Sequence, residues 1–410
     1  MLKLNNPMSN LGQTLKWELF RNFGEGVSQA LYQSLSLIVL VTAFAKTDFT
    51  HWYEAMISSA GFVGMMLAPF YVSLLAKGGF KKSTLIAWPT LVSGLLLIVI
   101  ATGTTAASFA VLCFFAFVIL PMRLPLVTSI YADNFPSDRR GKYSSYALMV
   151  AQSTTVAFYF FGGRWLEYQM DNYTWLFFIA ALVVCLSSYS ASKIPTEVHE
   201  KSATTNFLKS LSLIKEDRAF GLVLVVWFMF GFANLWIMPI RVNFLDEQLH
   251  LSAFEMSLVL GVIPEAARFV FTPVWGRIYD KVHFIKLRML LNVFLLISIA
   301  MFFWSTTIVG VAVASILFGM GLSGGRLAWG IWVSKMAPKN RIAEYMAVHV
   351  FLTGLRGTVG PFIGFWVLGL LTGTAHAYQI LAALSCALIG LSLVGLYQML
   401  PNKRFSDSRF

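Results

Sequence analysis

The chain has 410 residues, of which 57% are hydrophobic and only 12% are charged, and its mean hydropathy is +0.70. A soluble domain carries about twice this share of charged residues, so the composition argues against a water-soluble protein. The formal net charge of +12 does not indicate a nucleic-acid partner, because basic residues of a membrane protein gather where the chain meets the cytoplasm. We therefore predict an all-α polytopic membrane protein that lies in a lipid bilayer.

Apolar stretches between short polar breaks predict the transmembrane helices. A crossing needs about 20 mostly apolar residues, and twelve stretches meet this length. In chain order the predicted spans are 20–45, 53–76, 83–103, 107–132, 143–165, 173–193, 218–241, 253–277, 285–305, 308–333, 345–371 and 375–399.

The longest polar break divides the predicted spans into two groups of six. It predicts an N-terminal six-helix bundle at 1–193, a cytoplasmic linker at 194–217, a C-terminal six-helix bundle at 218–399 and a cytoplasmic tail at 400–410. Apolar residues at helical spacing within the linker predict a short amphipathic helix on the membrane surface.

The distribution of basic residues predicts the orientation. Of the 31 Lys and Arg residues, 24 fall in segments that lie inside if both termini are cytoplasmic, and only Lys46, Arg164 and Arg241 fall in outer loops. Basic residues mark the cytoplasmic side, so we expect a cytoplasmic (inner) membrane protein with both termini in the cytoplasm.

Two motifs recur in the two halves of the chain. Arg123-Leu124 precedes a loop with the pattern P-x-x-R-x-x-x-Y, which spans 136–143 and contains Arg139. Arg326-Leu327 precedes the same pattern at 338–345, which contains Arg341 and lies 202 residues later. Two parallel six-helix repeats are typical of secondary transporters.

On these motifs the chain resembles the major facilitator superfamily over essentially its whole length. The loop that begins Gly276-Arg-Ile-Tyr-Asp280-Lys281 is similar to the family signature G-x-x-x-D-[RK]-x-G, although His283 replaces the last glycine. The resemblance implies two bundles that rock about a central site. We assign five loop residues to gating, with a solvated loop charge as the alternative for Asp280: Gly276, Asp280, Lys281, Arg139 and Arg341.

Ionisable residues inside the predicted spans are the main candidates for function, because each costs at least a few kcal/mol in the bilayer. Glu265 and Arg268 are i, i+3 neighbours that can neutralise each other, and Glu25 could reach Arg123 at a similar depth. Both glutamates are candidates for proton coupling, with a permanent ion pair as the alternative. The six residues are Glu25, Arg123, Glu265, Arg268, Arg326 and Arg356.

This assignment leaves Arg326 and Arg356 without an evident acidic partner. An arginine in a watery cavity can bind a carboxylate or phosphate through its planar fork. We therefore predict Arg123, Arg326 and Arg356 as ligands of an anionic substrate. The alternative is that these side chains cap carbonyls freed at helix kinks or extend toward the membrane surface.

Polar and aromatic residues of the predicted spans complete the proposed substrate site. The family resemblance places the first and seventh spans around the cavity, and amide and aromatic side chains suit a small organic ligand. The candidates are Gln29, Gln33, Asn234, Trp236 and Trp329.

The sequence thus predicts a monomeric transporter that moves a small organic anion, coupled to protons. Two alternatives stay open: an efflux pump for amphipathic or cationic compounds, and a sensor that keeps the fold but does not transport. No motif of an enzyme, cofactor site or metal site is present in the sequence, and Cys113, Cys185 and Cys386 lie in apolar stretches where we expect them to pack.

Overall fold

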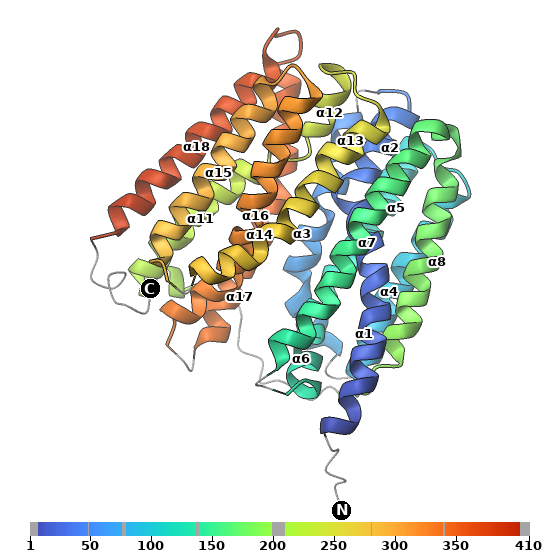
Figure 1. Cartoon of the computed structure of the whole chain (residues 1–410), viewed down its shortest axis with the longest axis vertical. Coiled ribbons are helices and arrows are strands. Elements are labelled where there is room, and N and C mark those ends of the chain that lie inside the picture. Colours follow the sequence, from blue (N-terminus) through green and yellow to red (C-terminus); the bar gives the residue numbers. More distant parts are fainter. Residues whose placement is uncertain are drawn as a thin grey trace, which may run out of the picture. The chain divides into compact units, whose positions relative to one another are not determined.

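The computed structural model describes residues 7–47, 49–75, 79–136, 139–198, 210–279, 281–338 and 341–401, and almost all of them are helical (Figure 1). The chain forms two compact units, Met1–Thr204 and Thr205–Phe410, called here the N-terminal and C-terminal units. The division lies inside the predicted linker. Of that linker, residues 199–209 fall outside the described ranges, and a short helix, α10 (Leu213–Glu216), follows them.

The N-terminal unit contains six membrane-crossing segments, three of which are interrupted or extended by short turns. The first continues through a π-helical turn without leaving the helix axis. The elements are α1 (Pro7–Ala30), η1 (Leu31–Leu35), α2 (Ser36–Ala43), α3 (Thr50–Leu75), α4 (Lys82–Ala101), α5 (Ala106–Ile119), η3 (Pro121–Arg123), α6 (Leu124–Asn134), α7 (Arg140–Tyr168), η4 (Met170–Asn172) and α8 (Tyr173–Ser192).

The C-terminal unit has the same six-segment plan. Its second crossing again passes through a π-helical turn, directly before Pro264. The elements after α10 are α11 (Arg218–Leu235), α12 (Arg241–Glu247), α13 (Ala253–Ser257), η5 (Leu258–Val262), α14 (Ile263–Tyr279), α15 (Phe284–Trp304), α16 (Ile308–Met336), α17 (Ile342–Leu370) and α18 (Ala377–Met399).

Among the described residues, twelve helical segments are long enough to cross a membrane, so the predicted fold class is confirmed. Eleven are long and apolar enough by composition alone. The twelfth is α7, which has 29 residues, ample for a bilayer, although its polar run 152–155 (Gln-Ser-Thr-Thr) dilutes its apolar character.

The first helix begins earlier than the sequence predicted. It starts at Pro7 rather than near residue 20, because one polar face packs inside the unit: Thr14, Glu18 and Arg21 follow each other at helical spacing and are all buried. Close helix packing requires small residues here, since a Cβ at Gly26 would lie 2.3 Å from the Ala151 carbonyl oxygen of α7.

The fourth crossing is broken at its two prolines. Helix α5 ends at Ile119, the turn η3 contains Pro121, and α6 carries Pro125 near its start. Each proline lacks an amide donor, so backbone carbonyls become available before the break. Arg326 occupies the repeat-related position in α16, which has no proline and continues unbroken.

The P-x-x-R-x-x-x-Y motif forms the same turn in both units. The Arg139 amide donates to the Pro136 carbonyl at 3.0 Å, and the Arg341 amide donates to the Pro338 carbonyl at 2.9 Å. Arg139 has φ −126° and ψ 6°, while Arg341 has φ −120° and ψ 7°. Each arginine thus precedes the first residue of a long helix, α7 or α17, in equivalent geometry.

Candidate functional site

The N-terminal unit holds a chain of alternating buried charges. Arg21 donates to both oxygens of Glu18, at 2.8 and 2.9 Å, and also to Glu25 at 3.2 Å. Glu25 in turn accepts a short hydrogen bond from Arg123. The order Glu18, Arg21, Glu25, Arg123 contains two negative and two positive groups, so this chain of charges is balanced.

Arg123 is fully engaged by protein acceptors. Its Nε donates to the Leu120 carbonyl at 3.0 Å, its Nη1 donates to Thr90 Oγ1 at 3.0 Å, and its Nη2 pairs with Glu25. Arg123 therefore contacts Glu25, as the sequence suggested, and it also donates to a backbone carbonyl beside the proline break. A role of Arg123 in substrate binding stays a prediction.

Glu25 is the accessible member of the charge chain. Its side chain is 33% exposed, whereas those of Glu18, Arg21 and Arg123 are 4% exposed or less. Glu18 gains two further hydrogen bonds, from Asn22 at 3.1 Å and from the Tyr131 hydroxyl at 2.6 Å. A solute or proton that enters the unit would meet Glu25 before the other three charges.

The C-terminal unit contains the predicted Glu265–Arg268 pair, with 2.5 Å between Oε1 and Nη1. Both side chains are 5% exposed. The second carboxylate oxygen of Glu265 and the Nη2 of Arg268 are buried and have no hydrogen-bond partner among the described residues. The ion pair therefore leaves one acceptor and one donor unused.

Arg326 differs from the other arginines of the spans because its side chain is exposed. It lies 10 residues before the end of α16, about 15 Å along the helix from that end. It interacts electrostatically with Arg268 and Glu265 of the adjacent helix α14. Within the described part of the chain it makes no hydrogen bond or ion pair of its own.

Arg356 is buried against α11. Its Nη1 donates to the Trp227 carbonyl at 2.6 Å and its Nη2 to Thr353 Oγ1 at 3.3 Å, while its Nε has no partner in the described ranges. Gly231 makes room for this guanidinium, because a Cβ there would lie 2.3 Å from Cζ of Arg356. The charge is held by neutral acceptors rather than by a carboxylate.

Arg288, near the start of the predicted span 285–305, is a buried cation that was not named as a site candidate. Its guanidinium lies 4.3 Å from the ring centre of Trp227 and 4.4 Å from that of Phe230, which are cation–π contacts. His349 lies in the same aromatic cluster, with ring centres of Trp329 and Trp332 at 5.0 and 5.1 Å. Arginine and histidine therefore occur here without an acidic partner in the described residues.

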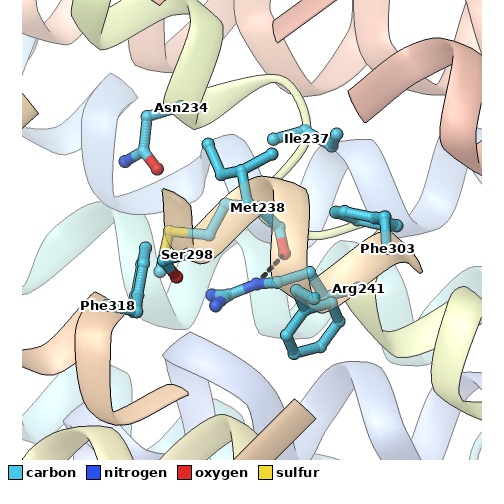
Figure 2. A pocket seen from close by; sticks show the side chains of 9 residues that line it. Asn234, Ile237, Met238, Arg241, Ser298, Phe303 and Phe318 are labelled. Carbon is cyan, nitrogen blue, oxygen red and sulfur yellow. Dashed lines mark hydrogen bonds between the residues drawn. The ribbon is translucent and has the colours of Figure 1, made fainter. Parts of the chain in front are cut away.

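Asn234 lines a small cavity in the C-terminal unit, shown in Figure 2. Arg241, counted above as an outer-loop charge, instead lies buried at this cavity, where its Nε donates to the Met238 carbonyl and its guanidinium lies over Phe318. The cavity measures about 10 Å³, which holds about one water molecule. It is too small for an organic solute.

The other predicted lining residues have separate surroundings. Gln29 and Gln33 are half-buried, on α1 and in the π-helical turn η1. Trp236 is buried and donates to Ser385 Oγ at 2.5 Å, and half-buried Trp329 donates to Thr353 Oγ1 at 3.3 Å. Trp329 thus shares an acceptor with Arg356. A role of these four residues in substrate binding stays a prediction.

The predicted gating residues that the structure describes lie at or near helix ends. Arg341 pairs with Glu344 at 2.9 Å, and this hydrogen-bonded carboxylate raises the pKa of Arg341. Gly276 is in α14, whereas Lys281 and Arg139 are exposed. Asp280, the proposed latch, lies outside the described residues.

Five buried Glu and Arg residues of the described ranges were not among the predicted site candidates: Glu18, Arg21, Glu54, Arg241 and Arg288. A signal existed for the first two, because Glu18, Arg21 and Glu25 lie at positions i, i+3 and i+7, which places them on one helix face. The signal for Arg288 was its place in the predicted span 285–305, whereas its aromatic partners Trp227 and Phe230 are about 60 residues away in the sequence.

Comparisons with known proteins agree with this architecture. The sequence profile described as Major Facilitator Superfamily matches residues 26–361 and 228–408. No curated protein matches the sequence.

Solved transporters of the same fold cover nearly the whole chain. The structure is similar to that of the nucleoside transporter NupG, with a TM-score of 0.74, 13% identity, and coverage of 95% of this chain and 100% of the other. The xylose transporter XylE from E. coli matches with a TM-score of 0.65, 13% identity and 98% coverage of both chains. A bacterial homologue of the human lysosomal transporter Spinster matches with a TM-score of 0.68, 13% identity and 98% coverage of both. From its profile match, its twelve crossings and this fold, the chain belongs to the Major Facilitator Superfamily.

Proposed function

We propose that this protein is a secondary active transporter that moves a small organic anion across the cytoplasmic membrane, coupled to protons, as a monomer with both termini inside. The names of its structural neighbours include a nucleoside and a sugar transporter. One fold serves many cargoes. The charge of the cargo must therefore be argued from the residues of this chain.

Unbalanced positive charge in the C-terminal unit carries the proposal. Arg288, Arg326 and Arg356 lie in membrane-crossing helices and pair with no carboxylate in the described residues, whereas the charges of the chain Glu18 to Arg123 cancel. Isolated charges in the bilayer cost several kcal/mol. A bound anion would supply the missing counter-charge.

Arg326 is the best-supported ligand of that anion. It combines exposure with a position well inside the helix, and its planar fork can donate two parallel hydrogen bonds to a carboxylate or phosphate. Arg356 offers a free Nε but is buried. Arg123 has weaker support, because protein acceptors occupy all three of its nitrogens.

Glu25 is the proposed proton-coupling residue. It is the accessible carboxylate of the buried charge chain, and two guanidinium groups favour its ionised form. Arg21 and Arg123 both donate to Oε2 of Glu25, and protonation of Glu25 would remove the negative charge that holds them there. Weaker contacts between α1 and the Arg123 turn would then link protonation to helix movement.

Proteoliposome transport tests both residues. An imposed pH gradient should drive uptake of organic acids by the unmodified protein, and Arg326→Gln should reduce that uptake about ten- to a hundredfold, the loss of one or two charge-assisted hydrogen bonds. Glu25→Gln should abolish uptake driven by the gradient but retain exchange of internal for external solute.

Arg218→Gln is the matched control, because Arg218 is an exposed arginine at the start of α11 in the same unit. Uptake by this variant should equal that of the unmodified protein. Uptake unaffected by Arg326→Gln would contradict the anion proposal. Export of cations that depends on Glu25 but not on Arg326 would instead support the efflux alternative.

A further inference from the structure

The Glu265–Arg268 ion pair is incomplete in a way that a simple structural pair is not. One oxygen and one nitrogen meet at 2.5 Å, yet the other oxygen, Oε2, and the other terminal nitrogen, Nη2, are buried without partners in the described residues. Buried charged groups that lack hydrogen bonds are costly, and such groups point to a bound molecule or to a functional role. The pair therefore presents one free acceptor and one free donor.

Local helix geometry explains why the pair sits where it does. The π-helical turn η5 ends at Val262, and Pro264 lacks the amide that would complete the next helical turn. Turns of this kind occur mostly as single insertions in helices, often at functional sites. Glu265 is the next residue, at the start of the regular helix α14.

Helix α16 brings a second guanidinium to the pair. A Cβ at Gly319 would lie 2.3 Å from the Pro264 carbonyl oxygen, so α14 and α16 touch through their backbones beside Glu265. Two turns further along α16, Arg326 interacts electrostatically with Arg268 and Glu265 and has an exposed side chain. The three side chains, two guanidinium groups and one carboxylate, carry one net positive charge.

This arrangement deepens the proposed function and rests on it. We propose that Glu265, Arg268 and Arg326 form a substrate subsite for a hydroxy or amino carboxylic acid. Arg326 and the free Nη2 of Arg268 donate to the acid group. The free Oε2 of Glu265 accepts from the neighbouring hydroxyl or ammonium of the same solute.

Other chemical classes fit this set of groups less well. An acid without a hydrogen-bond donor leaves Glu265 Oε2 unsatisfied. A cation without an acid group would be repelled by the two guanidinium groups. A neutral polyol satisfies the donor and acceptor but not the net positive charge. A competing explanation is a purely structural ion pair completed by ordered water, which predicts no selectivity for the donor group.

Matched solutes distinguish these explanations. Thermal stability of the purified full-length protein would be measured with propionate, lactate and alanine, and with succinate, malate and aspartate, using 1,2-propanediol as the neutral solute. In at least one set, the hydroxy or amino acid should bind about tenfold or more tightly than the parent acid.

Two substitutions assign the selectivity to the named groups. Glu265→Gln keeps an oxygen for Arg268 and replaces the free acceptor by an amide donor, so it should reduce the preference for the hydroxy or amino acid to about twofold or less. Arg326→Lys keeps the charge but loses the planar fork, and it should weaken all acids alike. Arg218→Gln should change neither property.

Each outcome decides the inference. Equal binding of the parent and substituted acids, unchanged preference in Glu265→Gln, or no binding by any acid of the panel would overturn it. If parent acids bind, are transported and depend on Arg326, the proposed function stands and only the subsite is wrong. If only neutral or cationic solutes are transported, the anion proposal fails as well.

Discussion

Arg356 and Gly231 show how a single missing side chain determines the place of a buried charge. The Arg356 guanidinium fits against α11 because residue 231 has no Cβ, and there it donates to the Trp227 carbonyl. The site thus depends on a glycine for space and on a carbonyl for partial neutralisation. Neither requirement is visible as a motif in the sequence.

We expect Gly231→Ala to displace the Arg356 guanidinium and break its bond to Trp227. The loss should lower the free energy of unfolding by about 1–3 kcal/mol, the cost of leaving a buried polar group unsatisfied. Denaturant titration of the purified protein in detergent measures this change.

Two comparisons make this measurement specific. Gly390→Ala in α18 should be neutral or stabilising, because a Cβ there meets no atom within 4 Å and alanine favours a helix. In an Arg356→Leu background, Gly231→Ala should cost less than in the unmodified protein. Equal costs in both backgrounds would mean that Arg356 is not the group displaced.

At residue scale, the sequence predicted those ion pairs whose partners lie on one helix or at a similar depth in the membrane. Glu265 and Arg268 are three residues apart, and Glu25 and Arg123 were matched by their positions along predicted spans. The partners of Arg288 could not be predicted, because they are the faces of aromatic rings on another helix. Apolar residues in a membrane protein are too common for such a contact to stand out.

At the scale of elements, the two copies of the P-x-x-R-x-x-x-Y turn share a backbone but differ in side-chain bonding. The Tyr345 hydroxyl donates to Asp217 at 3.0 Å, and Asp217 also caps α11 by accepting from the Phe220 amide. Tyr143 packs its ring against Phe135, with ring centres 5.6 Å apart, and its hydroxyl makes no hydrogen bond in the described ranges. The C-terminal copy thus ties together the starts of α17 and α11.

Tyr345→Phe should therefore lower the free energy of unfolding by about 1–2 kcal/mol, because it removes a hydrogen bond to a charged acceptor. Tyr143→Phe provides the matched comparison and should be neutral. Thermal unfolding of both variants, monitored by circular dichroism, checks the difference. An equal effect of the two substitutions would contradict the distinction between the copies.

The number and order of the crossings could be predicted from the sequence, but their exact form could not. The start of α1 at Pro7 was missed because a helix face that packs inside the protein can be polar, as Glu18 and Arg21 are. The π-helical turns η1 and η5 were also missed, since an added residue in a helix leaves the apolar composition unchanged. The break at Pro121 follows from the sequence more directly, because proline removes a donor wherever it occurs.

At the scale of the whole molecule, the structure sharpens the argument for orientation. Three basic residues counted in loops, namely Arg21, Arg241 and Arg288, are buried in helices and no longer contribute to the loop charges. Arg241 was one of only three basic residues assigned to outer loops. Without it, only Lys46 and Arg164 remain in that count. The excess of basic residues on the predicted cytoplasmic side is retained.

Cysteine labelling tests this orientation. In a variant without Cys113, Cys185 and Cys386, a cysteine in place of exposed Thr306 should react with a membrane-impermeant maleimide in intact cells. A cysteine in place of exposed Lys281 should react only after the membrane is permeabilised. The opposite pattern would place the termini outside.

The uneven arginine content of the two units also has an electrical consequence. A transmembrane voltage acts on each uncompensated elementary charge with about 2.3 kcal/mol per 100 mV if that charge crosses the full field. The linked charges from Glu18 to Arg123 add up to zero and feel almost no net force. Arg288, Arg326 and Arg356 do not cancel, so a resting cell that is negative inside pulls the C-terminal unit toward the cytoplasm, and an anion bound there would relieve part of that pull.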